Sequence, residues 1–284
     1  MANPDPIAPG LFAVHRDQID IAAKLYARVQ RNRFKADSDY DDDDDAPDGD
    51  RDDDFADELG EEVAKQTLDA ARYAVIPIRG VLMRGVAGLE CWGLCDYETV
   101  ADSVEDADND DNIDAIILVV DSPGGGVQGC QEAAARIAAV SKPVLVFTSG
   151  MLCSAAYWLT SSAEMIIATP SSAVGSIGVY RTFWDQSAAF DQMGVKVQVF
   201  SSGALKGAGQ PGTSLTDTQT AEIQKQVDAV AGDFWNEVLT NRPAVDLSLM
   251  DGRDVRGKEA VDLGLADLVV NEFGDAVSAF LATI

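Results

Sequence analysis

Apolar and polar residues alternate in blocks from residue 73 onward, and the blocks predict strands and helices in turn. The blocks expected to be strands are 73–81, 114–120, 143–148, 165–168, 195–200 and 266–270, with 176–179 as a further short candidate. Apolar residues recur at helical spacing in 97–107, 128–140, 154–163, 185–193, 216–240 and 257–263. Strands that alternate with helices are typical of a layered α/β fold around a parallel sheet.

The run from Asp114 to Val120 is the clearest of the predicted strands. Its residues after the aspartate are almost all β-branched or leucine, with no polar position between them. Such a run is typical of a strand that is buried on both faces. We therefore expect it at the centre of the sheet.

The first 71 residues have a different pattern, which predicts three further segments. Residues 11–35 carry an apolar stripe at helical spacing, and a second helical pattern covers 58–71. Between them, residues 37–62 form a low-complexity acidic stretch that we expect to be a solvated linker. The predicted organisation is an N-terminal helical segment (1–36), the acidic linker (37–62) and the main domain (63–284).

The charge is concentrated in that linker. The chain has 284 residues with 48 acidic and 21 basic side chains, a formal net charge of −27. Residues 37–62 contribute −15 of this, which leaves −12 for the remainder. A phosphate backbone or an anionic membrane surface would be repelled, so we expect neither as a partner. The linker lacks the glycine and glutamate spacing of an EF-hand calcium loop.

Targeting signals and cysteines favour a soluble protein in a reducing compartment. The first ten residues lack a basic region followed by an apolar one, and the longest apolar stretch, 143–159, is interrupted by polar residues. We therefore expect no membrane insertion and a cytoplasmic location. The four cysteines are expected to be free thiols, with no zinc site between Cys91 and Cys95.

Histidine usage restricts the chemistry that the chain can perform. The single histidine, His15, precedes the acidic linker. A Ser-His-Asp triad or a histidine metal site in the main domain is therefore not expected. If the chain catalyses acyl transfer, a lysine is the obvious alternative base, because burial can lower its pKa.

A glycine-rich turn from Asp121 to Gly126 follows the predicted central strand. Successive glycines allow backbone N–H groups to converge on an anion, either a phosphate or the oxyanion of a tetrahedral intermediate. The lysine pattern of a nucleotide-binding loop is absent, which makes phosphate the weaker interpretation. A plain glycine turn without function remains an alternative.

Two further segments carry candidate reactive groups. Ser154 opens a predicted helix after a strand and a glycine turn, where the helix N-terminus would stabilise negative charge, although a simple capping serine fits the same position. The neighbouring Cys153 is interpreted as a buried apolar residue. Lys206 lies in a glycine-rich loop without an acidic neighbour and is either a lysine with a lowered pKa or an exposed loop residue.

The glycine-rich turn, the Ser154 segment and the Lys206 loop, in this order along the chain, resemble the S49 family of serine peptidases, the signal peptide peptidase A family. The resemblance rests on Ile116–Gly125, Lys142-Pro143, Ser154–Trp158, Ala168–Pro170, Gly175–Val179, Ser202–Lys206, Gly252-Arg253 and Ala260–Asp267. It implies a Clp protease/crotonase-like layered fold of repeated strand–strand–helix units. It also implies a Ser-Lys endopeptidase that needs no cofactor or metal and that assembles as a homo-oligomer.

The resemblance implies specific roles for residues of this chain. Ser154 would be the nucleophile and Lys206 the general base. Backbone N–H groups of Gly124 or Gly125 and of Ala155 would form the oxyanion hole, and Ser176 would help to orient the lysine. An extended peptide is expected to dock beside residues 124–127, with small apolar residues before the cleaved bond.

The Ser-Ala-Ala-Tyr-Trp sequence is similar to the phage branch of the family, the prohead or capsid maturation proteases. That branch implies cleavage of scaffold, coat or the chain itself, in the host cytoplasm or the assembling prohead. Three alternatives stay open at this point. They are a host signal-peptide-peptidase-like protease, a crotonase-like enzyme acting on an acyl thioester, and a non-enzymatic assembly factor that works through its acidic segment.

Overall fold

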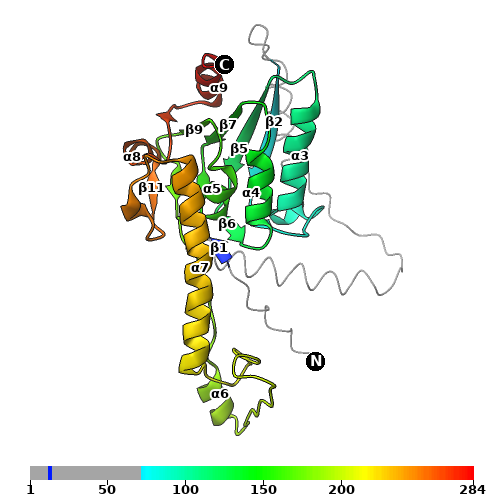
Figure 1. Ribbon diagram of the computed structural model, residues 1–284, viewed down its shortest axis with the longest axis vertical. Coiled ribbons are helices and arrows are strands. Elements are labelled where there is room, and N and C mark those ends of the chain that lie inside the picture. Colours follow the sequence, from blue (N-terminus) through cyan, green and yellow to red (C-terminus); the bar gives the residue numbers. More distant parts are fainter. Residues whose placement is uncertain (1–11, 15–71) are drawn as a thin grey trace, which may run out of the picture.

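The computed structural model describes residues 12–14 and 72–284 of the chain, and these residues form three sheets with helices packed around them (Figure 1). The strands are β1 (Phe12–Val14), β2 (Tyr73–Arg79), β3 (Val81–Met83), β4 (Leu94–Asp96), β5 (Ala115–Asp121), β6 (Gly124–Gly126), β7 (Val144–Thr148), β8 (Met151–Cys153), β9 (Met165–Ala168), β10 (Ala173–Gly175), β11 (Asp254–Arg256) and β12 (Leu268–Val269). The α-helices are α3 (Tyr97–Asn109), α4 (Cys130–Ala138), α5 (Ala155–Thr160), α6 (Ser187–Gln192), α7 (Asp217–Asn241), α8 (Gly257–Asp262) and α9 (Phe273–Leu281). Two short 3-10 helices are η2 (Glu90–Trp92) and η3 (Leu247–Leu249).

The central sheet has five parallel strands in the order β12-β9-β7-β5-β2. Its middle is fully buried, since Ile116, Ile117 and Leu118 of β5 have no exposed surface. The main core lies between the sheet and α3, α4 and α5, whereas α9 covers the other face, where Phe273 meets Phe147 edge to face. Coverage on both faces explains why the β5 sequence is continuously apolar.

Two smaller sheets lie at the carboxyl ends of the central strands. They have the orders β1-β6-β3-β4 and β11-β10-β8. Strand β5 is followed by the short β6 and then α4, and β7 is followed by the short β8 and then α5. The structure therefore confirms the predicted α/β fold of repeated strand–strand–helix units. The short strands matter for function because they carry the chain from the sheet to the glycine turn and to Ser154.

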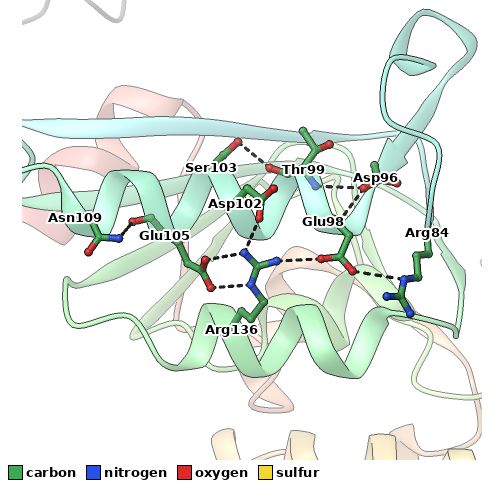
Figure 2. A network of polar contacts seen from close by, with 9 residues as sticks. All are labelled: Arg84, Asp96, Glu98, Thr99, Asp102, Ser103, Glu105, Asn109 and Arg136. Atoms are coloured by element: carbon green, nitrogen blue, oxygen red, sulfur yellow. Dashed lines mark hydrogen bonds and ion pairs between the residues drawn. The ribbon is translucent and has the colours of Figure 1, made fainter.

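A charged network joins α3 to α4 on the surface of the main core (Figure 2). The guanidinium of Arg136 contacts three carboxylates of α3, at 3.0 Å from Glu98, 2.5 Å from Asp102 and 2.6 Å from Glu105. Arg84 approaches Glu98 from the opposite side at 3.5 Å. The hydrogen bonds to Arg136 lower the pKa of Glu105 below its usual value. The network therefore ties the two helices together most strongly when the carboxylates are ionised.

Residues 182–216, with the first turns of α7, form an extension that we call the arm. In Figure 1 this segment lies at the far end of α7, away from the three sheets. A capping box at Thr216 and Gln219 starts α7, and Gln219 also donates from Nε2 to the carbonyl oxygen of Ala204 at 2.9 Å. The glycine-rich loop of the arm therefore packs beside the start of α7 and not against the sheets.

Most helices and central strands occur where the periodicity predicts them, but three predictions are wrong. Residues 195–200 form no strand and are exposed, because no neighbouring strand pairs with them. The short strand expected at 176–179 lies instead at β10, residues 173–175. Residues 12–14, expected within a helix, are the strand β1.

The remaining N-terminal predictions fall outside the described residues. They are the helical patterns in 15–35 and 58–71, the acidic linker at 37–62 and the position of His15. In the part of the chain that the structure describes, no helix has the length and apolarity needed to cross a bilayer.

Candidate active site

Ser154 occupies a strained turn between β8 and α5. Its backbone has φ 53° and ψ −122°, a conformation that favours glycine. Holding a non-glycine residue there costs on the order of 1–3 kcal/mol and persists only where the surroundings enforce it. A strained turn from strand to helix is a known way of presenting a nucleophilic serine.

Backbone hydrogen bonds on both sides enforce this turn. The N–H of Ser154 donates to the carbonyl oxygen of Gly175 at 2.7 Å, and its own carbonyl accepts from the N–H of Trp158 at 2.9 Å. Because Ser176 follows Gly175 directly, the predicted supporting serine is brought beside Ser154. Ser176 also has a positive φ of 53°, and among the described residues these two serines are the non-glycine residues with that geometry.

The predicted oxyanion turn lies against the strand that leads to Ser154. The N–H of Ser122 donates to the carbonyl of Met151 at 2.7 Å, and the N–H of Cys153 donates to the carbonyl of Ser122 at 3.2 Å. The N–H of Gly124 has a partner within the turn, the Ser122 hydroxyl at 3.2 Å. The other candidate, Gly125, is the middle residue of β6, so both candidate glycines lie in this strand.

Two glycines allow a close approach of neighbouring segments around the turn. A Cβ on Gly125 would lie 1.7 Å from the carbonyl oxygen of Leu82, and one on Gly150 would lie 2.2 Å from Oδ1 of Asp121. That carboxylate instead accepts the N–H of Met151 at 3.0 Å. Gly125 therefore permits close packing of β6 on β3, and Gly150 permits close packing of the β7–β8 turn on the end of β5.

The helix that begins after Ser154 is anchored in the main core. All six residues of α5 are buried, and the ring of Trp158 stacks on Phe234 of α7 at a centroid distance of 4.7 Å. The indole Nε1 of Trp158 donates to Glu237 at 2.7 Å. The N–H of Ala155 lies in the first turn of α5, where backbone donors have no intrahelical acceptor, so it is available to a developing oxyanion.

Lys206 lies far from Ser154 within one protomer. Its side chain is exposed, and its loop packs beside Gln219 at the start of α7. The α5 helix instead contacts α7 at Glu237, and since a helix rises about 1.5 Å per residue, these two positions on α7 are about 27 Å apart along its axis. Of the two interpretations of Lys206, the exposed loop residue is the one that the protomer shows.

Cys153 is a poor alternative nucleophile. It has no exposed surface, and its thiol lies 3.5 Å from the carbonyl oxygen of Ala173. Burial raises the pKa of this thiol well above its usual value, so that the reactive thiolate is disfavoured. The buried apolar role predicted for Cys153 agrees with this environment.

Sequence reasoning missed three features of the site. They are the short strand β8, the strand β10 whose Gly175 carbonyl holds the Ser154 N–H, and the positive φ of both serines. The glycine in Ala173–Gly175 was the available signal for a close backbone approach. The other features depend on contacts between segments that are distant in sequence.

Comparisons with known proteins identify a family and several relatives. The model of peptidase family S49 matches residues 136–280. The capsid assembly protease C of Escherichia phage lambda is 32% identical over 70% of this chain and 46% of its own length. The head–tail preconnector protein GP5 of Enterobacteria phage P21 is 27% identical over 74% of this chain and 43% of its own length. Protease 4 of Salmonella typhi is 29% identical over 72% of this chain and 33% of its own length.

The chain thus spans less than half the length of these three curated relatives. The matched family segment takes in α5 with its preceding serine, the arm and α7. The glycine turn lies upstream of that segment. The chain belongs to peptidase family S49.

Proposed function

We propose that the chain is a serine endopeptidase in which Ser154 is the nucleophile and Lys206 of a neighbouring copy is the general base. The strained turn at Ser154, φ 53° beside the glycine strand β6, is the observation that carries the proposal. Family membership supports proteolysis as the reaction class.

The exposed surface of the arm supports a base that comes from another copy. Large apolar side chains are exposed here, with Trp184 at 81% and Phe200 at 92%. Their neighbours with exposed apolar surface are Met193, Val195, Val197, Val199 and Leu205. A second copy packed against this surface would remove it from water, and association would then carry Lys206 to a serine in the adjoining protomer.

The proposed reaction needs only groups of the protein and water. Neutral Lys206 accepts the proton of the Ser154 hydroxyl as the oxygen attacks the peptide carbonyl. The N–H groups of Gly124 or Gly125 and of Ala155 bind the resulting oxyanion, and collapse of the intermediate expels the amine, which takes the proton from the lysine. Water, deprotonated by the same lysine, then attacks the ester carbonyl of the acyl-enzyme; the bond to the Ser154 oxygen breaks, and that oxygen takes the proton back from the lysine.

A role in capsid assembly is supported by the similarity to the lambda protein, whose name assigns it to that process. We propose the scaffold or coat proteins of a phage head as substrates. Similarity to Protease 4 supports a housekeeping protease as the second candidate. Co-expression with phage head proteins distinguishes the two candidates, because only the capsid-assembly role predicts cleavage of the scaffold or coat protein.

Mixing of two inactive variants tests the shared site. Ser154→Ala and Lys206→Ala proteins are each expected to lose cleavage of scaffold or peptide. If they are mixed at equal amounts under conditions that allow subunit exchange, about a quarter of the interfaces should regain an intact pair. Lys196→Ala, a change of another exposed lysine in the arm, should remain active.

The outcomes separate the alternatives. No recovery on mixing, with both variants oligomeric, would contradict a base donated by a neighbouring copy. Full activity of both single variants would refute the dyad itself. Labelling of wild type, but not of Ser154→Ala, by a fluorophosphonate probe would identify the nucleophile independently of the natural substrate.

A further inference from the structure

Strand β6 lies between two partners, one of which comes from the N-terminal segment. On one side Gly125 pairs in parallel with Leu82 of β3. On the other side β1 pairs antiparallel with β6, with Phe12 opposite Gly126, Ala13 opposite Gly125 and Val14 opposite Gly124. Figure 1 shows β1 as the short blue strand next to β6.

The start of β6 lies close to the segment that carries the proposed catalytic serine. The turn that precedes β6 is hydrogen-bonded to Met151 and Cys153, immediately before Ser154. Without β1, β6 would be an edge strand whose backbone groups could accept any extended peptide. Three glycines offer that peptide a backbone surface with no side chains in the way.

The direction of β1 matches that of a substrate. Val14, the last residue of β1, is opposite Gly124. Two residues before Gly124, Ser122 is bridged to β8, the strand that directly precedes Ser154. The segment therefore runs toward the serine at its C-terminal end. In a substrate bound antiparallel to β6, the residues that precede the cleaved bond would take this path.

We propose that Phe12–Val14 occupy the substrate position on β6 and act as an intramolecular competitor of peptide substrates. The competition with substrates rests on the proposed function, whereas the occupancy of the edge does not. Attachment through the same chain keeps the segment at a local concentration in the millimolar range, far above that of a free peptide in a micromolar solution. A substrate must displace these residues before it can bind.

Disulfide mapping tests occupancy without any need for catalysis. Directly opposed residues in an antiparallel pair have Cα atoms about 4.5–5.5 Å apart, within the range of a disulfide. A Cβ on Gly126 meets nothing closer than Oε1 of Gln128 at 4.0 Å, so the position tolerates a cysteine. We expect Phe12→Cys with Gly126→Cys to crosslink within one chain, in a Ser154→Ala, Cys91→Ser background and in dilute solution.

The matched control moves one cysteine by two positions. In the pair Val14→Cys with Gly126→Cys, the two residues lie on the same face of the sheet but are diagonal neighbours, about 7–8 Å apart. It should crosslink several-fold more slowly than the opposed pair. Equal rates for the two pairs, or crosslinks only between chains, would overturn the proposed occupancy.

A cleavable tether tests the competition. A site-specific protease sequence inserted between Gly49 and Asp50 allows the N-terminal fragment to be released after purification, with every residue still present. Release at micromolar protein should increase the hydrolysis of a dilute fluorogenic peptide by about fivefold or more, through a lower KM with kcat unchanged. A synthetic peptide of residues 8–18 should restore inhibition, and a scrambled peptide should not.

A locked form provides the control for tether release. After tether cleavage, the Phe12→Cys, Gly126→Cys protein with Ser154 intact should be slower in its oxidised form than in its own reduced form, a comparison in which the cysteine at position 126 is present on both sides. Activity that does not change on release or on reduction would refute competition, whereas the proposed function would stand. Absence of peptidase activity in every form, with the opposed pair still crosslinked, would refute the proposed function and leave the occupancy in place.

Discussion

The layered body, which consists of the three sheets and the helices packed on them, and the arm each contain a tryptophan, and the two lie in opposite environments. Trp158 in α5 is 1% exposed and stacks on Phe234, whereas Trp184 in the arm is 81% exposed. The body buries its apolar residues within one chain, so its fold is complete in the protomer. The arm leaves much of its apolar surface in water, a surface of the kind that marks an interface.

The same division applies to the candidate catalytic groups. The body positions Ser154 through hydrogen bonds with Gly175 of β10 and Trp158 of α5, whereas the arm presents Lys206 on an exposed loop. The nucleophile therefore depends on how the protomer folds. In the proposed mechanism, the base depends on how protomers associate.

The largest contrast between the two regions is expected from the two tryptophans. Trp158→Ala should lower the free energy of unfolding by about 3–5 kcal/mol, because it leaves a cavity and removes the partner of Glu237. Trp184→Ala should change it by less than about 0.5 kcal/mol and instead reduce oligomerisation and peptidase activity. Denaturant unfolding and analytical ultracentrifugation measure the two effects. A destabilisation by Trp184→Ala as large as that by Trp158→Ala would contradict the division.

Two glycines provide a smaller contrast. Gly125→Ala would place its methyl group against the carbonyl oxygen of Leu82, so we expect a loss of about 1–3 kcal/mol in unfolding free energy. A Cβ on Gly203 in the arm meets nothing within 4 Å, and its replacement by alanine should be nearly neutral. Thermal unfolding of both variants checks this. A neutral Gly125→Ala would show that β3 and β6 are less closely packed than the structure has them.

The smallest contrast concerns the pH dependence of stability. Arg136 lowers the pKa of Glu105 in the body below its usual value of 4.5, so this carboxylate stabilises the fold above that pH. The contribution is lost as the pH falls through the lowered pKa, and it should be missing in Glu105→Gln. Wild type and this variant should therefore differ at pH 7 and converge in acid, as measured by urea unfolding at each pH.

Asp185 of the arm is the matched control for Glu105. Hydrogen bonds from Ser187 lower the pKa of Asp185, but they lie within the arm at the start of α6. Asp185→Asn should leave the unfolding of the body unchanged at every pH. A pH-dependent loss equal to that of Glu105→Gln would show that arm and body unfold as one unit.

Much of the body could be predicted from local sequence. The continuous β-branched run at 114–120 predicts a central buried strand, and the helical spacing of apolar residues over 128–140 predicts a helix with one apolar face. The structure confirms both, with Cys130, Ala133, Ala134 and Ile137 as the buried face of α4. The position of Ser154 between a strand and a helix could also be predicted from the sequence. These features depend on neighbours in sequence, because periodicity reports which face of an element meets the core.

Tertiary structure decided the features in which distant segments meet. The run at 195–200 has an apolar pattern but no strand to pair with, so it remains exposed and irregular. The positive φ of Ser154 depends on the carbonyl of Gly175, and the strand at 12–14 exists only through its pairing with β6. The sequence by itself determined the layered fold and the nucleophile candidate. Backbone pairing between remote segments decided how the serine is held and which segment of the chain lies on the edge of β6, because such pairing depends on contacts that no local pattern encodes.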